Sequence, residues 1–213
     1  MAFLGGLRIE REIANLFEHG DYDRTQIQQS SYDLRLGEEY YISGKKAPEK
    51  MSEKKQYLSL APGQFAILTC HERLKLPRSV LGLITLRNTF KMQGLVNVSG
   101  FHVDPMFKGR LVFAVQNVGP NDIRLRWMEP TFTIFFADVE DGKDKVRKPR
   151  LGIELEDIQR LGGNSITLSK LKKDIDTIRT VLLIYAPFAV ALFIALIMNI
   201  IKSNAGAKIP NIP

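Results

Sequence analysis

Cysteine and histidine, the side chains that most often hold zinc or act as nucleophile and base, are few and scattered. Cys70 is the only cysteine, and His71 and His102, two of the three histidines, lie far apart in the chain. Zinc sites need several such ligands at close spacing. The sequence therefore predicts no metal site built by the protein. A single cysteine also allows no intrachain disulfide, which is typical of a reducing compartment.

The cationic side chains point to a different chemistry. The formal net charge is +7, which predicts affinity for anions such as nucleotide phosphates or lipid headgroups. The densest basic segment is KDKVRKPR, residues 143–150. It is either a solvated linker or a phosphate contact. Aromatic residues do not alternate with its cations, so no nucleic-acid partner is expected.

Short strands must position any site in the first two thirds of the chain. Residues 8–19 place Ile9, Ile13, Leu16 and Phe17 at helical spacing, and Gly20 is a plausible end for that helix. From about residue 29 to residue 139, apolar or alternating runs are separated by turn residues. This pattern predicts an antiparallel sandwich or barrel.

The last part of the chain predicts helices of another kind. Residues 166–180 are expected to form an amphipathic stalk. Its apolar positions recur at steps of three and four residues, as in a coiled-coil seam, although a plain amphipathic helix would show a similar stripe. The stripe consists of Leu168, Leu171, Ile175, Ile178, Leu182 and Tyr185. Residues 181–201 carry no charge and are long enough to span a bilayer as one helix, which Pro187 should kink or loosen.

These segments predict a domain organisation and a location. We expect a β domain over residues 1–140, a polar linker over 141–165, then the stalk, the span and a short tail over 202–213. The first twelve residues lack an apolar core typical of a signal peptide. More cations precede the span than follow it, which predicts a single-pass membrane protein with its N-terminal domain in the cytoplasm. The cations concerned are Lys170, Lys172, Lys173 and Arg179 before the span, and Lys202 and Lys208 after it.

Four ordered segments resemble the dUTPase and dCTP deaminase superfamily. They are SSYDLRLG (30–37), LAPGQFAILTCHERLKLPRSVLGLITLRNTF (60–90), SGFHVDPMFKGRLVFAVQNVG (99–119) and WMEPTFTIFFADV (127–139). The resemblance covers roughly residues 8–140. It implies a mainly β fold, a distorted jelly-roll β-barrel of the dUTPase type with an N-terminal helix. It also implies a homotrimer with nucleotide sites between subunits, which would suit a coiled-coil stalk on the same threefold axis.

The residues that the resemblance assigns to deamination are largely absent. The proton-shuttling glutamate of the deaminases corresponds to Ala114, and no acidic residue lies between Lys108 and Asn121. The serines and second arginine of the Arg-Ser-Ser segment correspond to Asn88, Thr89 and Met92. The chain is therefore expected to be a catalytically degenerate member without deaminase activity.

The residues assigned to nucleotide binding are better preserved. The resemblance implies nucleotide contacts from Arg87, Asn88, Thr89, Asp104 and Gln116. Asp104 matches the aspartate that orients water in dUTPases, with Mg²⁺ as cofactor if a nucleoside triphosphate is bound. However, Asp104 precedes a proline and opens a tight turn, where aspartate is common for structural reasons.

Further parts of the resemblance concern support and closure. Asp33 is expected to support the barrel and a neighbouring loop. RLGGNS (160–165) stands where dUTPases carry a glycine-rich closing motif, and it runs directly into the stalk.

Three functions remain open at this point. The first is a membrane-anchored nucleotide-binding protein that acts as a sensor or membrane effector, for instance in stress signalling or antiviral defence. The second is a membrane-attached pyrophosphatase for dUTP or a related nucleotide, with Asp104 as the base. The third is a scaffold whose barrel only trimerises. The partners expected are a nucleotide, the lipid bilayer and further copies of the chain.

Overall fold

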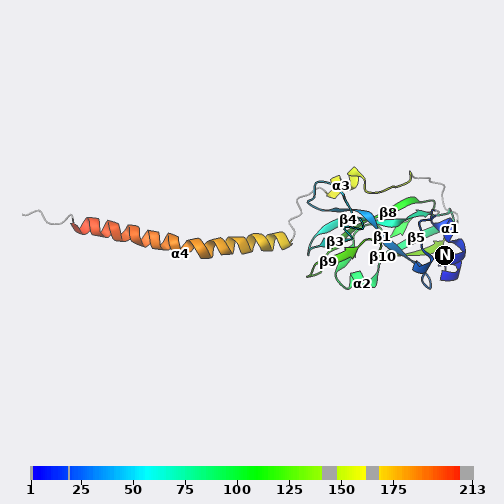
Figure 1. The fold of residues 1–213 in the computed structure, drawn as a ribbon, viewed down its shortest axis with the longest axis horizontal. Coiled ribbons are helices and arrows are strands. Elements are labelled where there is room, and N and C mark those ends of the chain that lie inside the picture. The colour runs from blue at the N-terminus through cyan, green and yellow to red at the C-terminus, as the bar shows by residue number, and fades with distance from the viewer. Residues whose placement is uncertain (1, 19, 141–147, 162–167, 207–213) are drawn as a thin grey trace, which may run out of the picture. The chain divides into compact units, whose positions relative to one another are not determined.

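The protein is mainly β, as predicted. A computed structural model describes residues 2–18, 20–140, 148–161 and 168–206. It divides into two compact units, Met1–Thr167 and Leu168–Pro213 (Figure 1). The strands are β1 (Tyr32–Ile42), β2 (Glu49–Lys50), β3 (Tyr57–Leu60), β4 (Phe65–Lys75), β5 (Val80–Leu86), β6 (Leu95–Asn97), β7 (His102–Val103), β8 (Lys108–Asn117), β9 (Ile123–Arg126) and β10 (Pro130–Asp138). The helical segments of the first unit are α1 (Gly6–Leu16), η1 (Arg24–Gln26), α2 (Asn88–Lys91) and α3 (Leu155–Leu161).

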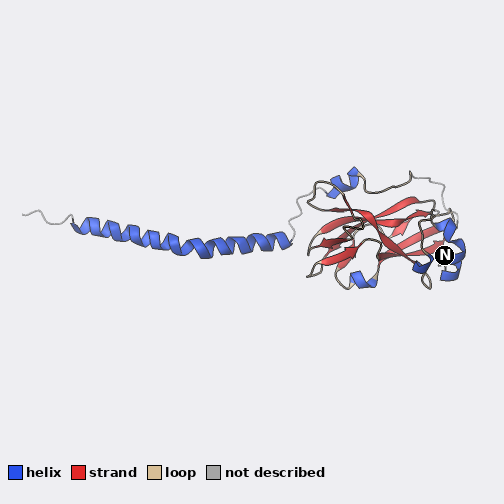
Figure 2. Ribbon diagram, viewed as in Figure 1, coloured by secondary structure: helices blue, strands red, loops and turns tan. Residues whose placement is uncertain are grey.

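The strands form one curled antiparallel sheet and a small second sheet (Figure 2). The order in the large sheet is β6-β8-β4-β1-β10-β5-β7, with β2 paired to β1, and β3 pairs with β9. Some neighbours in this order are far apart in the sequence, as β1 and β10 are when they pair Asp33 with Thr133. This is the distorted barrel that the resemblance predicts.

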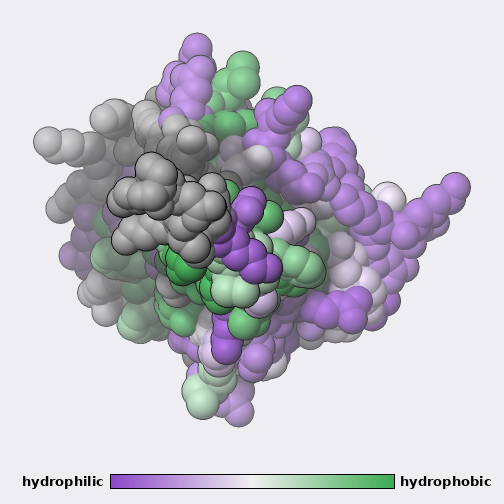
Figure 3. Space-filling model, turned by 90° about the vertical axis from the view of Figure 1, so that its left-hand side faces the viewer, coloured by the Kyte–Doolittle hydropathy of each residue, from purple (hydrophilic) through white to green (hydrophobic). Residues whose placement is uncertain are grey.

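One hydrophobic core fills the barrel. Along β8 the side chains alternate, so that Leu111, Phe113 and Val115 are buried while Val112 and Ala114 lie on the other face. Such alternation is what one buried sheet face requires. At the centre of the core, the rings of Phe113 and Phe132 stack with their centroids 3.6 Å apart. Hydrophilic side chains dominate the right-hand side of the view in Figure 3.

Helix α1 is present but ends earlier than predicted. It buries Ile9, Ile13 and Leu16 and stops at Leu16, not near residue 19. Phe17 leaves the helix because its ring is fully buried against Tyr32, with 4.6 Å between centroids, and because its backbone forms a bridge to Leu74 of β4. Burying this aromatic ring outweighs one further helical turn.

A polar cluster is buried inside the barrel beside α1. The Glu72 carboxylate is fully buried and accepts hydrogen bonds from the Arg35 Nε (2.7 Å) and the Arg35 backbone N–H (3.0 Å). Burial raises the pKa of Glu72, and the Arg35 guanidinium opposes that shift. Burial likewise raises the pKa of the neighbouring Cys70 thiol, so this cysteine is an inert core residue.

Part of the predicted polar linker lies along the barrel. Residues 141–147 and 162–167, which include most of KDKVRKPR and RLGGNS, lie outside the described residues. Between them, Arg150 forms a parallel bridge with Gly109, and the Arg110 N–H donates to the Arg150 carbonyl oxygen at 2.7 Å. Gly109 has φ +123°, and a Cβ there would lie 2.1 Å from that oxygen. This segment is therefore fastened to the start of β8.

Within its described residues, 168–206, the second unit is one helix, α4 (Leu168–Gly206). It runs without interruption through Pro187 and covers both the predicted stalk and the predicted span. By length and composition alone, Lys173–Lys202 is able to cross a membrane. This is a weak indication of a membrane segment, and it agrees with the span predicted at residues 181–201.

Candidate functional site

Three of the five predicted nucleotide-binding residues lie together where β5 leads into α2. Arg87 caps α2, and its backbone N–H donates to the Thr131 carbonyl oxygen at 3.0 Å. Phe90 anchors the short helix in the core. Asn88 and Thr89 consequently remain exposed at the start of the helix, with their polar side chains accessible to a ligand.

The Arg87 side chain already has a partner within the chain, the carboxylate of Asp33. Its Nε lies 3.5 Å from Oδ2 of Asp33, and the Arg87 side chain is 41% exposed. Asp33 is nearly buried and accepts a hydrogen bond of 2.7 Å from the Thr133 hydroxyl. This contact ties β1 to the loop after β5, which is the supporting role expected for Asp33. An incoming phosphate would compete with Asp33 for the same guanidinium.

Lys91 is a second cation at this place, and the sequence argument missed it. Its Nζ donates to the Thr85 hydroxyl at 3.0 Å. Thr85 pairs across the sheet with Thr133, which pairs with Asp33, so three polar side chains stand side by side on β5, β10 and β1. The spacing from Arg87 to Lys91 is four residues, which places both cations on one side of a helical turn. This four-residue spacing is the feature of the sequence from which Lys91 could have been predicted as a second cation at the site.

Asp104 stands at the end of β7 and opens a tight turn. The Phe107 N–H donates to the Asp104 carbonyl oxygen, and Met106 has φ +63°. The Asp104 carboxylate lies 3.5 Å from the His102 Nε2, and its side chain is 42% exposed. A turn of this kind normally carries glycine at the position of Met106. Asp104 therefore opens a hydrogen-bonded turn, and its carboxylate is accessible to water.

Asp104 does not meet the α2 residues within one chain. Strand β7 pairs with the beginning of β5, where Val103 lies opposite Gly82, so Asp104 falls beside Leu81. Arg87 follows the far end of β5. At about 3.3 Å per residue, the two sites are roughly 20 Å apart along the strand. Arg87, Asn88 and Thr89 therefore form one group on each chain, and Asp104 lies apart from it.

Gln116 and Ala114 lie on β8, which is far from β5 in the sheet order, although β6, the strand paired with Gln116, packs against β5 and α2. The Gln116 side chain donates to the Gly63 carbonyl oxygen at 3.4 Å, and Gln116 pairs with Val96 of β6. Ala114 lies opposite Ile67 of β4, and the Val98 N–H donates to its carbonyl oxygen at 2.8 Å. The strand neighbours of Ala114 are thus apolar, and no carboxylate is contributed from these positions.

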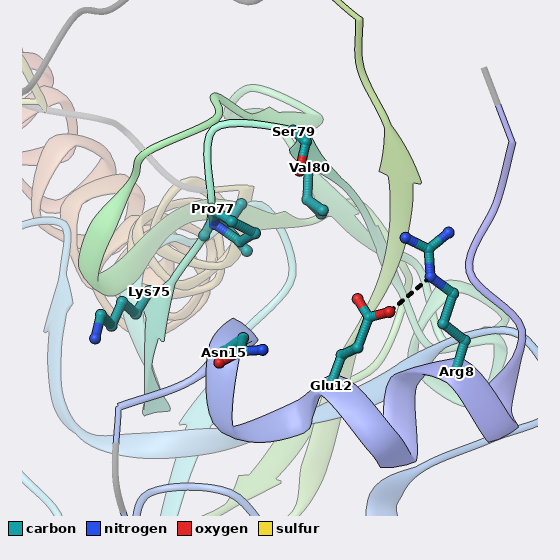
Figure 4. A pocket seen from close by; sticks show the side chains of 8 residues that line it. Arg8, Glu12, Asn15, Lys75, Pro77, Ser79 and Val80 are labelled. Atoms are coloured by element: carbon teal, nitrogen blue, oxygen red, sulfur yellow. Dashed lines mark hydrogen bonds and ion pairs between the residues drawn. The ribbon is translucent and has the colours of Figure 1, made fainter.

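Two hollows on the barrel surface contain none of the five predicted residues. One lies between α1 and the turn after β4, holds about 370 Å³ and contains the Arg8–Glu12 ion pair (Figure 4). The other holds about 430 Å³ and is lined by β1, β8 and the segment of residues 149–154. On the single chain, Asn88 and Thr89 of the α2 group are exposed.

Comparison with known proteins places this fold in a defined class. A solved structure of 2'-deoxycytidine 5'-triphosphate deaminase from Agrobacterium tumefaciens superposes with a TM-score of 0.52 at 19% identity. The match covers 63% of this chain and 47% of that one, about half of its length. At this identity the likeness shows the fold alone, a barrel like that of the dCTP deaminase structure.

The sequence comparison gives the family. The family described as dCTP deaminase-like matches residues 3–139, so the chain belongs to the dCTP deaminase-like family. The chain is similar to dCTP deaminase of Pyrococcus horikoshii, at 29% identity over 56% of this chain and 74% of the relative. It is also similar to dCTP deaminase of Thermococcus sibiricus, at 32% identity over the same shares. The predicted resemblance is confirmed.

Proposed function

We propose that the barrel binds a pyrimidine nucleoside triphosphate without deaminating it, and that α4 anchors the barrel in a bilayer. The substrate class follows from the relatives, which are named dCTP deaminase. The observation that carries the loss of deamination is Ala114. Exchanging an amino group for water requires a group that moves protons, and a methyl group cannot do this. Neither Ile67 nor Val98 beside it supplies a substitute.

The phosphates would be held at the start of α2. Arg87 and Lys91 supply positive charge, and the exposed Asn88 and Thr89 supply hydrogen-bond donors. In the described part of the chain no group of His, Cys, Asp or Glu could hold a metal ion. Mg²⁺, if bound, would arrive with the nucleotide and be held mainly by its phosphates.

A complete site would need more than one copy of the chain. The roughly 20 Å between Arg87 and Asp104 along β5 is too long for one nucleotide contact with both groups on the same chain. If the barrel assembles as the predicted trimer, the α2 group of one copy can face the Asp104 or Gln116 group of the next. Ligand occupancy would then alter the contact between copies. This is how a binding module could signal without turnover.

Nucleotide titration of the full-length protein in detergent tests this proposal. We expect a heat of binding with dCTP, dUTP or dTTP in the presence of Mg²⁺, and no ammonia released from dCTP. Lys91→Ala should weaken binding, whereas Lys46→Ala, in the exposed loop after β1, should not. Absence of binding to the whole panel, cyclic nucleotides included, would contradict the proposal. Ammonia release that depends on the protein would contradict its catalytic part.

Membrane attachment is tested separately by fractionation. The chain should stay with the membrane after carbonate washing and require detergent for release. Protease added to sealed inverted vesicles should remove the barrel if the N-terminal domain is cytoplasmic. Recovery of the full-length chain in the aqueous fraction would contradict the anchor.

A second candidate function rests on the accessible carboxylate of Asp104. With His102 at 3.5 Å, this carboxylate could activate water against a phosphate of dUTP or a related nucleotide. Release of pyrophosphate, abolished by Asp104→Ala and unaffected by Asp122→Ala on the loop before β9, would establish a pyrophosphatase. No release from dUTP or dCTP with Mg²⁺ would leave binding as the function.

A further inference from the structure

The predicted apolar stripe of α4 does not end at Tyr185. Continuing the same steps of four and three residues leads through Ala189, Leu192 and Leu196 to Asn199. All of these positions belong to one helix, and all are exposed on the isolated chain. The stalk and the apolar segment therefore share one face. We call this face the α4 seam and define it by Leu171, Ile175, Ile178, Leu182, Tyr185, Ala189, Leu192, Leu196 and Asn199.

The charges beside the seam are complementary between two parallel copies. With Ile175 and Leu182 at position a of the heptad, Asp174 occupies g and Arg179 occupies e. In a parallel coiled coil a residue at g faces the residue at e five positions later on the neighbouring helix. Asp174 of one copy would therefore meet Arg179 of the next. An antiparallel pair would place Arg179 against another basic e position.

Asn199 places an amide on the seam within the apolar segment. An amide in hydrocarbon lacks water as a partner, and an amide from a neighbouring helix can replace it. Two copies in parallel register bring one Asn199 to the other. The position of the asparagine on the seam gives the apolar segment a polar contact between helices.

Pro187 is compatible with such a contact. It falls at position f, opposite the seam, so its ring would point away from a neighbouring helix. The heptad spacing also drifts by about 20° per heptad on a straight helix. Helices that keep the seam in contact must therefore coil around each other with a left-handed twist.

We propose that α4 associates in parallel and in register with α4 of further copies of this chain along the α4 seam. The contact is held by Asp174 and Arg179 outside the apolar segment and by Asn199 within it. This inference rests on the proposed membrane anchor, and it adds the partner, the face and the register.

A charge exchange tests the register. In full-length protein reconstituted in lipid vesicles, Asp174→Arg alone and Arg179→Asp alone should each weaken self-association roughly three- to tenfold. Asp174→Arg combined with Arg179→Asp in one chain should recover association, because each g position then again faces an opposite charge at e in a parallel assembly of any number of copies. Failure of the combined variant to recover would overturn the parallel register.

Engineered cysteines test the face. Ile178→Cys and Leu182→Cys lie on the seam, and Thr177→Cys and Thr180→Cys are matched controls on the other side of the same turns. The native Cys70 is buried, so its background is low. Disulfides between copies should form roughly tenfold faster at the seam positions. Equal rates at all four positions would overturn the proposal.

Moving the asparagine tests the contact inside the apolar segment. Asn199→Ile combined with Ile201→Asn keeps the composition and places the amide at f. Association should weaken to the level of Asn199→Ile alone. Unchanged association in both variants would overturn the role of Asn199.

These results separate the seam from the function on which it rests. Suppose that the cysteines react equally on every face while the protein stays in the vesicles and binds nucleotide. This result would contradict association along the α4 seam and leave the proposed function intact. Recovery of the unsubstituted chain in the aqueous fraction would contradict the membrane anchor and therefore also the Asn199 contact in the membrane.

Discussion

The barrel and α4 contain the same kinds of apolar side chain but use them in opposite ways. In β8, Phe113 and Val115 are at most 1% exposed, whereas Phe193 and Leu192 of α4 are 64% and 76% exposed. The barrel closes its core through pairing between strands distant in sequence. Helix α4 satisfies its backbone with bonds to the next turn and leaves its side chains for its surroundings to cover. The barrel therefore carries its own stability, and α4 depends on a lipid or protein environment.

The largest expected effect comes from breaking the buried ion pair in the barrel. Glu72→Gln removes the charge that compensates Arg35, whose side chain is only 13% exposed. Loss of one partner of a buried pair should lower the free energy of unfolding by about 3 kcal/mol. Urea denaturation measures it. Glu38→Gln, which removes the surface partner of Lys50, should cost about 0.5 kcal/mol or less. If the two substitutions lowered the free energy of unfolding equally, burial of the ion pair would not determine its contribution.

A charge in the middle of α4 should weaken its insertion into a membrane without affecting the barrel. Phe193→Lys should make insertion into the bilayer about 3 kcal/mol less favourable, because a lysine there cannot reach the lipid headgroups. Carbonate extraction should then release the variant, while the melting temperature of the barrel stays unchanged. Ile201→Lys, near the end of the apolar segment, is the matched control and should remain membrane-bound. Release of both variants would point to a general loss of folding.

Relieving the strained turn at Met106 should stabilise the barrel and leave α4 unaffected. Met106 has φ +63°, a conformation that costs a residue with a Cβ about 1 kcal/mol and costs glycine little. Met106→Gly should therefore raise the free energy of unfolding by up to about 1 kcal/mol. Met92→Gly is the control, because Met92 has an ordinary φ of −66° and should gain nothing. A loss of stability in Met106→Gly would mean that its side chain contributes more than the turn costs.

The smallest effect concerns pH and a surface carboxylate. Hydrogen bonds from Lys55 and Tyr40 lower the pKa of Glu49 to about 2. The unfolded chain then binds this proton more readily than the folded one, so stability should fall as the pH drops from about 4.5 toward 2. Because the Glu49 side chain is 33% exposed and that of Lys55 is 52% exposed, water screens the pair, and the share of Glu49 should be about 0.5 kcal/mol or less. Urea denaturation at pH 3 and pH 6 gives the change in the free energy of unfolding between the two pH values. This change should be slightly smaller for Glu49→Gln than for the unsubstituted chain. An identical difference would indicate that the ion pair contributes nothing.

The sequence by itself determined the elements whose causes are local or shared with a family. The apolar run at residues 181–201 predicts a helix because helical hydrogen bonds close within one turn. The ordered motifs from SSYDLRLG to WMEPTFTIFFADV identify the barrel because they match a known arrangement. The heptad steps of α4 could likewise be read from the residues alone.

Only the tertiary structure decided which of the candidate site residues meet. The separation of Arg87 from Asp104 depends on the register between β5 and β7, which joins segments distant in the chain. The contact of Arg87 with Asp33 depends on where β1, β10 and β5 lie side by side. Phe17 ended α1 early because the core had room for its ring. Strand register and core packing are set by many distant contacts at once, and no local pattern encodes them.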